Sequence, residues 1–233
     1  MKSTTLRTLL LEALAVLAGI LAAFGIDAAW QARSDLEREA TYIAALQNEV
    51  SANQLIVSEG VNELDEEIPL IQGFYTSVVT SDGAVPPSQI LTMVRYMGPR
   101  RLELEQVALT DLLNSGGLAY LDRPELRRAI ARYERRLAQV TSSRESLRGF
   151  FEQELNPYYS AHASMPDMFN LIGNVLRGFE FPEGDFSIDT DAFVRNRTFA
   201  NLLTNYLYYL ELIRGSEVRL LESGDDLLAL LAG

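Results

Sequence analysis

The sequence predicts an all-α protein, in which a single N-terminal transmembrane helix continues into an extramembrane antiparallel helical bundle. Three observations predict this fold. An apolar run lies close to the start of the chain. Apolar residues then recur every three or four positions, or every seven, through most of the remaining sequence. No proline occurs before Pro69, so nothing interrupts the first helical pattern where the apolar run ends.

The apolar run covers residues 9–30 and predicts the transmembrane helix. Between Leu9 and Ile26 only Glu12 is charged, and ten of these 18 residues are Leu, Ile, Val or Phe. As a helix the 18 residues extend roughly 27 Å, close to the ~30 Å hydrocarbon core of a bilayer. Asp27 closes the run, and Trp30 is positioned as an interfacial anchor, where an aromatic residue meets the lipid headgroups.

A cleaved signal peptide is the main alternative interpretation of this run. Lys2 and Arg7 form a positive start, and Ala23-Phe24-Gly25 resembles a cleavage site. The run is long for a signal peptide, however, and a helical pattern continues directly out of it. We therefore expect an uncleaved anchor.

The anchor divides the chain into a short cytoplasmic tail (1–8), the transmembrane helix (9–30) and a helical periplasmic domain (31–233). Arg and Lys are nearly balanced across the run, so the positive-inside rule gives only a slight preference. The short N-terminal tail favours a signal anchor in the bacterial inner membrane, with the N-terminus inside and the C-terminal domain outside.

Small residues recur at four-residue spacing on the anchor, at Ala15, Gly19 and Ala23. Such a face lets two helices approach closely in lipid, so these residues are the candidate site for helix packing against another membrane subunit or a second copy. The alternative is that small residues are simply common in membrane helices.

A long helix is expected beyond Trp30. Apolar residues recur every seven positions and charged residues fill the other faces; the repeating positions are Leu36, Ile43, Val50, Val57 and Leu64. This pattern predicts a helix to about residue 59 or 68, with Pro69 breaking or kinking it. Asn53 and Gln54 interrupt the stripe, which favours the core of a bundle over a homodimeric coiled coil.

Further helices are predicted at residues 88–97, 102–113, 123–155, 167–176 and 191–222. Residues 70–80 fit a helix or a short strand, and a helix is favoured. Ser88 is the expected cap of its helix, and Asn114-Ser115-Gly116-Gly117 is a helix-ending signal. Apolar residues line one face of residues 126–151, with Arg144 as the one exception. A leucine-rich tail after Gly224 is expected either to dock on the bundle or to contact a partner.

Charge and composition exclude several functional classes. The net charge of −12 argues against nucleic acid as a partner. The chain has no cysteine and a single histidine, His162, which is expected in a loop. Thiol catalysis, cysteine zinc sites and sites with several histidines from one chain are therefore excluded. No phosphate loop or hydrolase motif occurs, so we expect no enzyme, no catalytic residues and no cofactor.

One acidic loop partly follows the spacing of calcium ligands, at Asp185, Ser187, Asp189 and Asp191. Its sixth position is Thr190 rather than glycine, and its twelfth is Asn196 rather than glutamate. A solvated loop in which an aspartate caps the next helix is the simpler interpretation, so no metal is expected.

Three blocks of sequence carry a resemblance to a known family. They are the run from Arg33 to Glu49 after the anchor, the run from Leu109 to Leu118, and the run from Pro124 to Tyr133. Together they resemble uncharacterised bacterial envelope proteins with one N-terminal transmembrane helix and an α-helical soluble domain. The resemblance implies no activity and no functional residues.

The expected function is that of a non-enzymatic accessory or scaffold subunit of a larger inner-membrane complex, with an energy-converting, respiratory or photosynthetic complex as a possible host. Its expected partners are membrane lipid and other integral membrane subunits, or a second copy of the chain. The alternative is a periplasmic sensor or ligand-binding module, which would need a pocket. Tyr206, Tyr208 and Tyr209 are the candidates for lining it.

Overall fold

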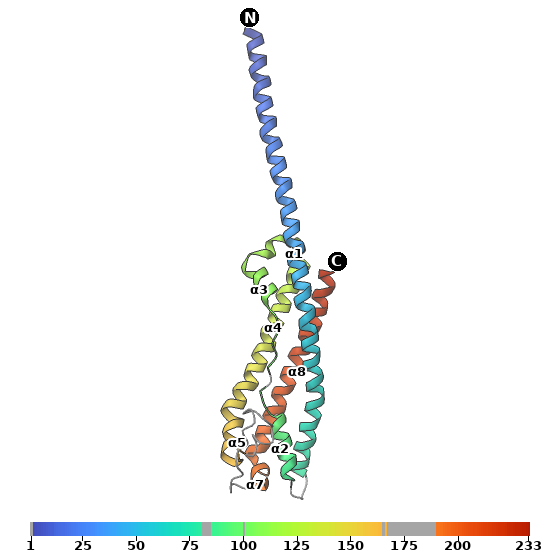
Figure 1. Cartoon of the computed structure of the whole chain (residues 1–233), viewed down its shortest axis with the longest axis vertical. Helices are drawn as coiled ribbons and strands as arrows, with labels where there is room; N and C mark the ends of the chain where they lie inside the picture. Colours follow the sequence, from blue (N-terminus) through green and yellow to red (C-terminus); the bar gives the residue numbers. More distant parts are fainter. Residues whose placement is uncertain (1, 81–84, 100, 165, 167–189) are drawn as a thin grey trace. The chain divides into compact units, whose positions relative to one another are not determined.

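The computed structural model describes residues 2–80, 85–99, 101–164, 166 and 190–233. The regular elements of these residues are all helical, which confirms the predicted all-α class (Figure 1). They are α1 (Lys2–Thr80), α2 (Pro87–Tyr96), α3 (Val107–Asn114), the 3₁₀ turn η1 (Gly117–Tyr120), α4 (Pro124–Phe150), the π-helical turn η2 (Phe151–Leu155), α5 (Asn156–His162), α7 (Thr190–Val194) and α8 (Arg197–Leu231).

The chain forms two compact units. The first contains Met1–Glu49 and Gln106–Arg127, and the second contains Val50–Glu105 and Arg128–Gly233. Helix α1 contributes its first part to one unit and its second part to the other. These units differ from the predicted tail, transmembrane helix and periplasmic domain, whose boundaries lie at residues 9 and 30. That membrane-based division stays a prediction.

The second unit is built on the parallel helices α1 and α4 with α8 antiparallel to both. Polar contacts fix this register. Along α1 and α8, Gln54 bonds to the Leu221 carbonyl and Asp65 pairs with Arg214. Along α4 and α8, Arg132 lies 3.6 Å from Asp226 and Arg144 pairs with Glu217. Apolar residues of α1, α2, α4, α5, α7 and α8 share one core. The predicted antiparallel arrangement is therefore found within this unit.

Pro69 does not end α1, which continues to Thr80. The predicted end at residue 59 or 68 is therefore wrong, although residues 70–80 are helical as expected. The reason is packing, because the buried stripe continues past the proline through Ile71, Phe74 and Val78. The burial of these side chains outweighs the hydrogen bond that proline cannot donate.

Residues 101–106 are not helical, although the sequence predicts a helix over 102–113. The Asn53 side chain holds the backbone of Glu105 from both sides, donating to its carbonyl at 2.7 Å and accepting from its amide at 2.9 Å. A buried amide that satisfies both backbone groups competes directly with helix formation there. Within the predicted range of 102–113, only the residues that belong to α3 are helical.

Several other boundaries differ from the prediction. The helix that begins at Pro124 continues through η2 and α5, so His162 lies at a helix end and not in a loop. Helix α2 begins at Pro87 with Pro86 at its N-cap, so Ser88 is not the cap. The last helix is split, because the side chain of Asn196 caps α8 by accepting from the Phe199 amide.

The leucine-rich tail is the end of α8, with Leu227 and Leu231 buried. The predicted helix at residues 167–176 and most of the acidic, calcium-like loop, including Asp185, Ser187 and Asp189, lie outside the described residues.

Candidate functional site

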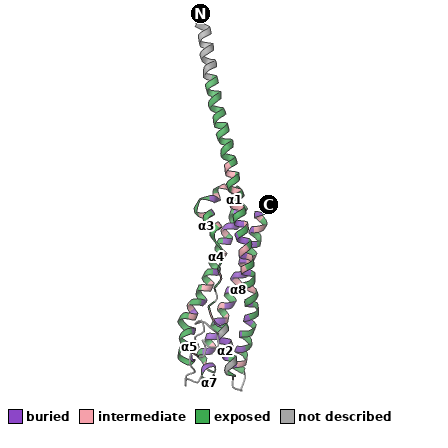
Figure 2. Ribbon diagram, in the orientation of Figure 1, coloured by how far each residue is buried: buried purple, intermediate pink, exposed green. Residues whose placement is uncertain are grey.

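The first part of α1 carries an exposed apolar surface. Within the described part of the chain, α1 is the one helix that is long and apolar enough to cross a membrane. Its side chains are exposed from Leu14 onward, and Phe24 and Ile26 are 68% and 72% exposed (Figure 2). Soluble monomers rarely leave such a large contiguous apolar surface uncovered.

The predicted anchor residues all lie on this surface. Ala15, Gly19 and Ala23 are exposed, and a Cβ atom added to Gly19 would meet no atom within 4 Å. Trp30 is 76% exposed at the end of the apolar run. The structure thus leaves the small-residue face open for a partner, but their roles in packing and at the interface stay predictions.

Residues 106–121, which we call the α3–η1 segment, run along α1 toward the anchor. At one end, Glu49 accepts from the backbone amides of Ala108 at 2.6 Å and Leu109 at 3.1 Å. These are free amides in the first turn of α3, where a carboxylate is favoured. Farther along, the hydroxyls of Tyr42 and Ser115 lie 2.9 Å apart.

The same segment ends nearest to the anchor at η1. Arg38 donates to the hydroxyl of Tyr120 at 3.0 Å, and its guanidinium lies 5.4 Å from the centre of the Tyr120 ring. Gly116 adopts a left-handed conformation with φ of 75°. At the buried Gly117 a Cβ atom would lie 2.7 Å from Leu112 and 3.1 Å from the Tyr42 ring. The two glycines therefore let the chain turn and pack tightly on α1.

Sequence reasoning missed this docking. The Asn114-Ser115-Gly116-Gly117 signal correctly marked the end of a helix, but a helix end does not say what the chain packs against. The useful signal was the second glycine, because a helix cap needs only one residue in the left-handed conformation.

The buried stripe of α1 begins later than predicted. Leu36, predicted to start it, is 66% exposed, and the first buried residue of the stripe is Leu46.

A buried ion pair lies within the second unit. Both oxygens of Glu217 are buried. Oε1 accepts from Arg144, with Nε at 2.7 Å and Nη2 at 2.5 Å, whereas Oε2 has no hydrogen-bond partner among the described residues. Gly60 of α1 packs against this pair, since a Cβ there would lie 3.2 Å from Oε2. Burial raises the pKa of Glu217, and the nearby Glu63 adds to the rise, while Arg144 acts in the opposite direction.

Arg144 is the exception noted in the apolar stripe of residues 126–151, and Glu217 explains it. A charged residue at a core position signals a buried partner, but the sequence does not say which acid on another helix supplies it.

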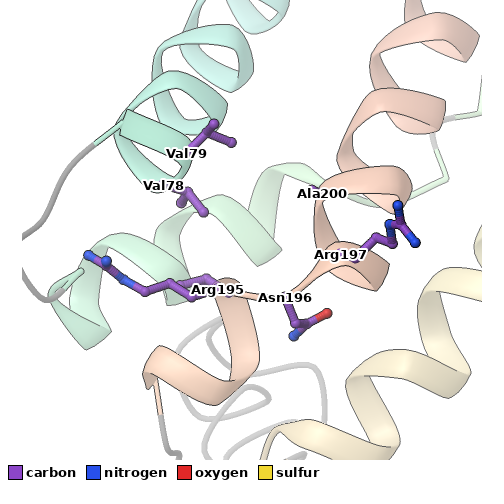
Figure 3. A pocket seen from close by; sticks show the side chains of 7 residues that line it. Val78, Val79, Arg195, Asn196, Arg197 and Ala200 are labelled. Carbon is purple, nitrogen blue, oxygen red and sulfur yellow. The ribbon is translucent and has the colours of Figure 1, made fainter.

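A cavity of about 330 Å³ lies where the end of α1 meets α7 and the start of α8. Val78, Val79, Val194 and Ala200 supply its apolar lining, with Arg195, Asn196 and Arg197 beside them. The side chains of Arg195 and Arg197 point in opposite directions (Figure 3). Asn196 donates to the Tyr158 hydroxyl and to two backbone carbonyls. The polar groups thus do not converge on a shared ligand position.

The three tyrosines proposed to line a sensor pocket lie in different surroundings. Tyr206 is fully buried in the core, with its hydroxyl near the carbonyls of Tyr96 and Gly98. Tyr208 is 60% exposed, and Tyr209 packs on Phe150. Within the described part of the chain, no group of three or more His, Cys, Asp or Glu residues could hold a metal ion.

Comparisons with protein-family models, curated proteins and solved structures found no match to this chain. The resemblance to bacterial envelope proteins therefore stays a prediction from the sequence.

Proposed function

We propose that this protein is a single-pass, non-enzymatic scaffold subunit of a larger assembly in the bacterial inner membrane. The observation that carries the proposal is the exposed apolar surface of α1, none of whose described side chains is buried. Lipid is the environment that such a surface fits, because every backbone polar group of a helix is satisfied internally.

The rest of the molecule supports a scaffold more than a catalyst. Several of its buried polar groups stabilise packing: Glu49 caps α3, Asn53 holds residue 105, and Arg144 pairs with Glu217. The described polar groups beside the cavity near Val78 do not converge on one position. In this proposal the N-terminus is cytoplasmic, the C-terminal domain is periplasmic, and the partners are other integral membrane subunits or a second copy.

Purification from native membranes in a mild detergent, followed by mass spectrometry, tests the proposal. We expect the chain to co-purify with integral membrane proteins, or with itself, in a complex larger than a monomer. Recovery of a detergent-solubilised monomer with no partner in stoichiometric amount would contradict the subunit role. The absence of cysteine helps a second test, because single cysteines introduced at Ser3 and Thr204 can report which side of the membrane each end occupies.

A further inference from the structure

The α3–η1 segment ends at a defined height above the anchor. Tyr120 contacts Arg38, which follows Trp30 by eight residues, or about 12 Å of helix at 1.5 Å per residue. The other end of the segment is held at Glu49, 19 residues beyond Trp30, or about 28 Å. Of the residues packed on α1 within this unit, those around Tyr120 are therefore nearest to the anchor.

The length of α1 between Trp30 and Arg38 suits a headgroup layer. Polar headgroups add about 5–8 Å on each side of the hydrocarbon core. Residues 31–33 are exposed, and the side chains of Arg33 and Glu37 are 81% and 70% exposed. A headgroup layer surrounding these residues would extend nearly to Arg38 and to the turn at residues 119–123. Helix tilt shortens the remaining gap.

We infer that the turn at residues 119–123, held on α1 by the Arg38–Tyr120 contact, rests on the phospholipid headgroups and sets the depth of the anchor. This inference depends on the proposed membrane anchor. Tyrosine and arginine both suit this level of a membrane, because each has an apolar body and a polar tip.

The charge here points to zwitterionic headgroups as the partner. Arg33 lies 3.1 Å from Glu37, and Arg38 lies 3.7 Å from Asp35, so each arginine already has a carboxylate beside it. Residues 27–39 together carry two more acids than arginines. Anionic lipid should therefore not strengthen the contact.

Tryptophan fluorescence quenching measures this depth directly, because Trp30 is the only tryptophan. In a Trp30→Phe background, Ala119→Trp places a probe on the exposed turn and keeps the Arg38–Tyr120 contact. Val107→Trp is the matched control, because Val107 is 80% exposed at the far end of the same segment. The full-length chain is reconstituted in phosphatidylcholine nanodiscs that carry a spin label on the headgroup.

We expect quenching of the probe at residue 119 and none above background at residue 107. Inserting four residues between Ala32 and Arg33 lifts the turn by about 6 Å, and it should abolish the quenching at residue 119. Circular dichroism confirms that each variant keeps its helix content. Equal quenching at both positions, or at neither, overturns the inference, as does quenching that appears only with anionic lipid.

The wild-type chain separates this inference from the proposed anchor. Quenching of Trp30 by lipids labelled near the glycerol end of the acyl chain reports the anchor itself. If Trp30 is quenched and residue 119 is not, the anchor stands and the resting turn is wrong. If Trp30 is not quenched, the proposed membrane anchor itself is contradicted.

Discussion

Glu217 carries its carboxylate in the core of the second unit. Its carboxylate is fully buried, with Oε1 bonded to Arg144. Oε2 faces Gly60 and accepts no hydrogen bond from the described part of the chain. A buried ion pair gains Coulomb energy but loses hydration, and the loss is often the larger of the two. The raised pKa of Glu217 shows that the loss of hydration is larger at this site.

The pH dependence of stability follows from that raised pKa. Because the folded-state pKa exceeds the unfolded one, the folded state favours the proton, and this contribution is lost as pH rises through the folded-state pKa. Glu217→Gln cannot ionise, so its stability relative to wild type should increase as the pH rises above about 4.3, the usual pKa of an unfolded glutamate.

Urea unfolding of both proteins across this range measures the effect. A stability difference that stays constant with pH would mean that Glu217 has the same pKa folded and unfolded.

Removing one partner of this pair should be far more harmful than removing both. Arg144→Met leaves a buried carboxylate without a counter-ion, which costs about 3–5 kcal/mol of unfolding free energy. Replacing both residues, with Arg144→Met and Glu217→Leu, should recover most of that loss. A double-mutant cycle by chemical denaturation gives the coupling energy, and additive effects would show that the two side chains do not interact.

Sequence reasoning reached this site only in part. Arg144 was recognisable, because it interrupts a stripe of apolar residues at helical spacing. Glu217 was not, because it lies among several acids of α8 and only tertiary packing distinguishes it from exposed ones such as Glu222. Whether a charged side chain is buried depends on which helices pack against it. The sequence pattern of one helix does not identify those neighbours.

At the scale of elements, the α3–η1 segment depends on one close approach. Gly117 lies so near Leu112 and Tyr42 that a methyl group has no room. Gly117→Ala should therefore lower stability by about 1–3 kcal/mol, as overpacking does elsewhere. Gly149→Ala is the matched control, since its Cβ meets no atom within 4 Å and alanine favours helix α4.

Thermal unfolding of the two glycine variants, followed by circular dichroism, compares these effects. Gly117→Ala should melt below wild type and Gly149→Ala at or above it. Equal melting of Gly117→Ala and wild type would show that the segment tolerates a looser contact with α1.

The small-residue face of the anchor leads to a different prediction. In lipid no hydrophobic effect drives helices together, so association needs close packing. Gly19→Leu should weaken recovery of partners while leaving membrane insertion intact, because leucine inserts at least as well as glycine. Leu17→Phe lies on the opposite side of the helix and should leave recovery unchanged.

Co-purification with equal membrane-fraction yield measures this effect. Unchanged partner recovery with Gly19→Leu would mean that the small residues only face lipid and that the extramembrane domain makes the contacts.

Periodicity predicted the long helices because their burial repeats along the chain. It failed where a single side chain or a long apolar stripe overrode a local signal. Pro69 lies inside α1 since Ile71, Phe74 and Val78 extend the core beyond it. Residues 101–106 are extended because Asn53 binds the backbone of Glu105. Both outcomes depend on contacts between residues that are distant in sequence. Helix propensity describes single residues and takes no account of such contacts.

At the scale of the whole molecule, the chain combines the exposed apolar surface of α1 with a helical unit that has its own buried core. The second unit has its own core, so it does not need the apolar surface in order to fold. That surface is therefore available for lipid. The central claim is that residues 9–30 cross a bilayer and stay attached to the domain.

Alkaline carbonate extraction of membranes that contain the full-length chain tests this claim most directly, with intact-mass measurement of the extracted protein. We expect the chain to remain in the membrane pellet with residues 9–30 uncleaved, whereas a variant with Leu17→Lys and Leu21→Lys should be released because charge at a helix centre opposes insertion. Release of the wild-type chain into the supernatant, or a mass that lacks the first 25 residues or so, would contradict the membrane anchor.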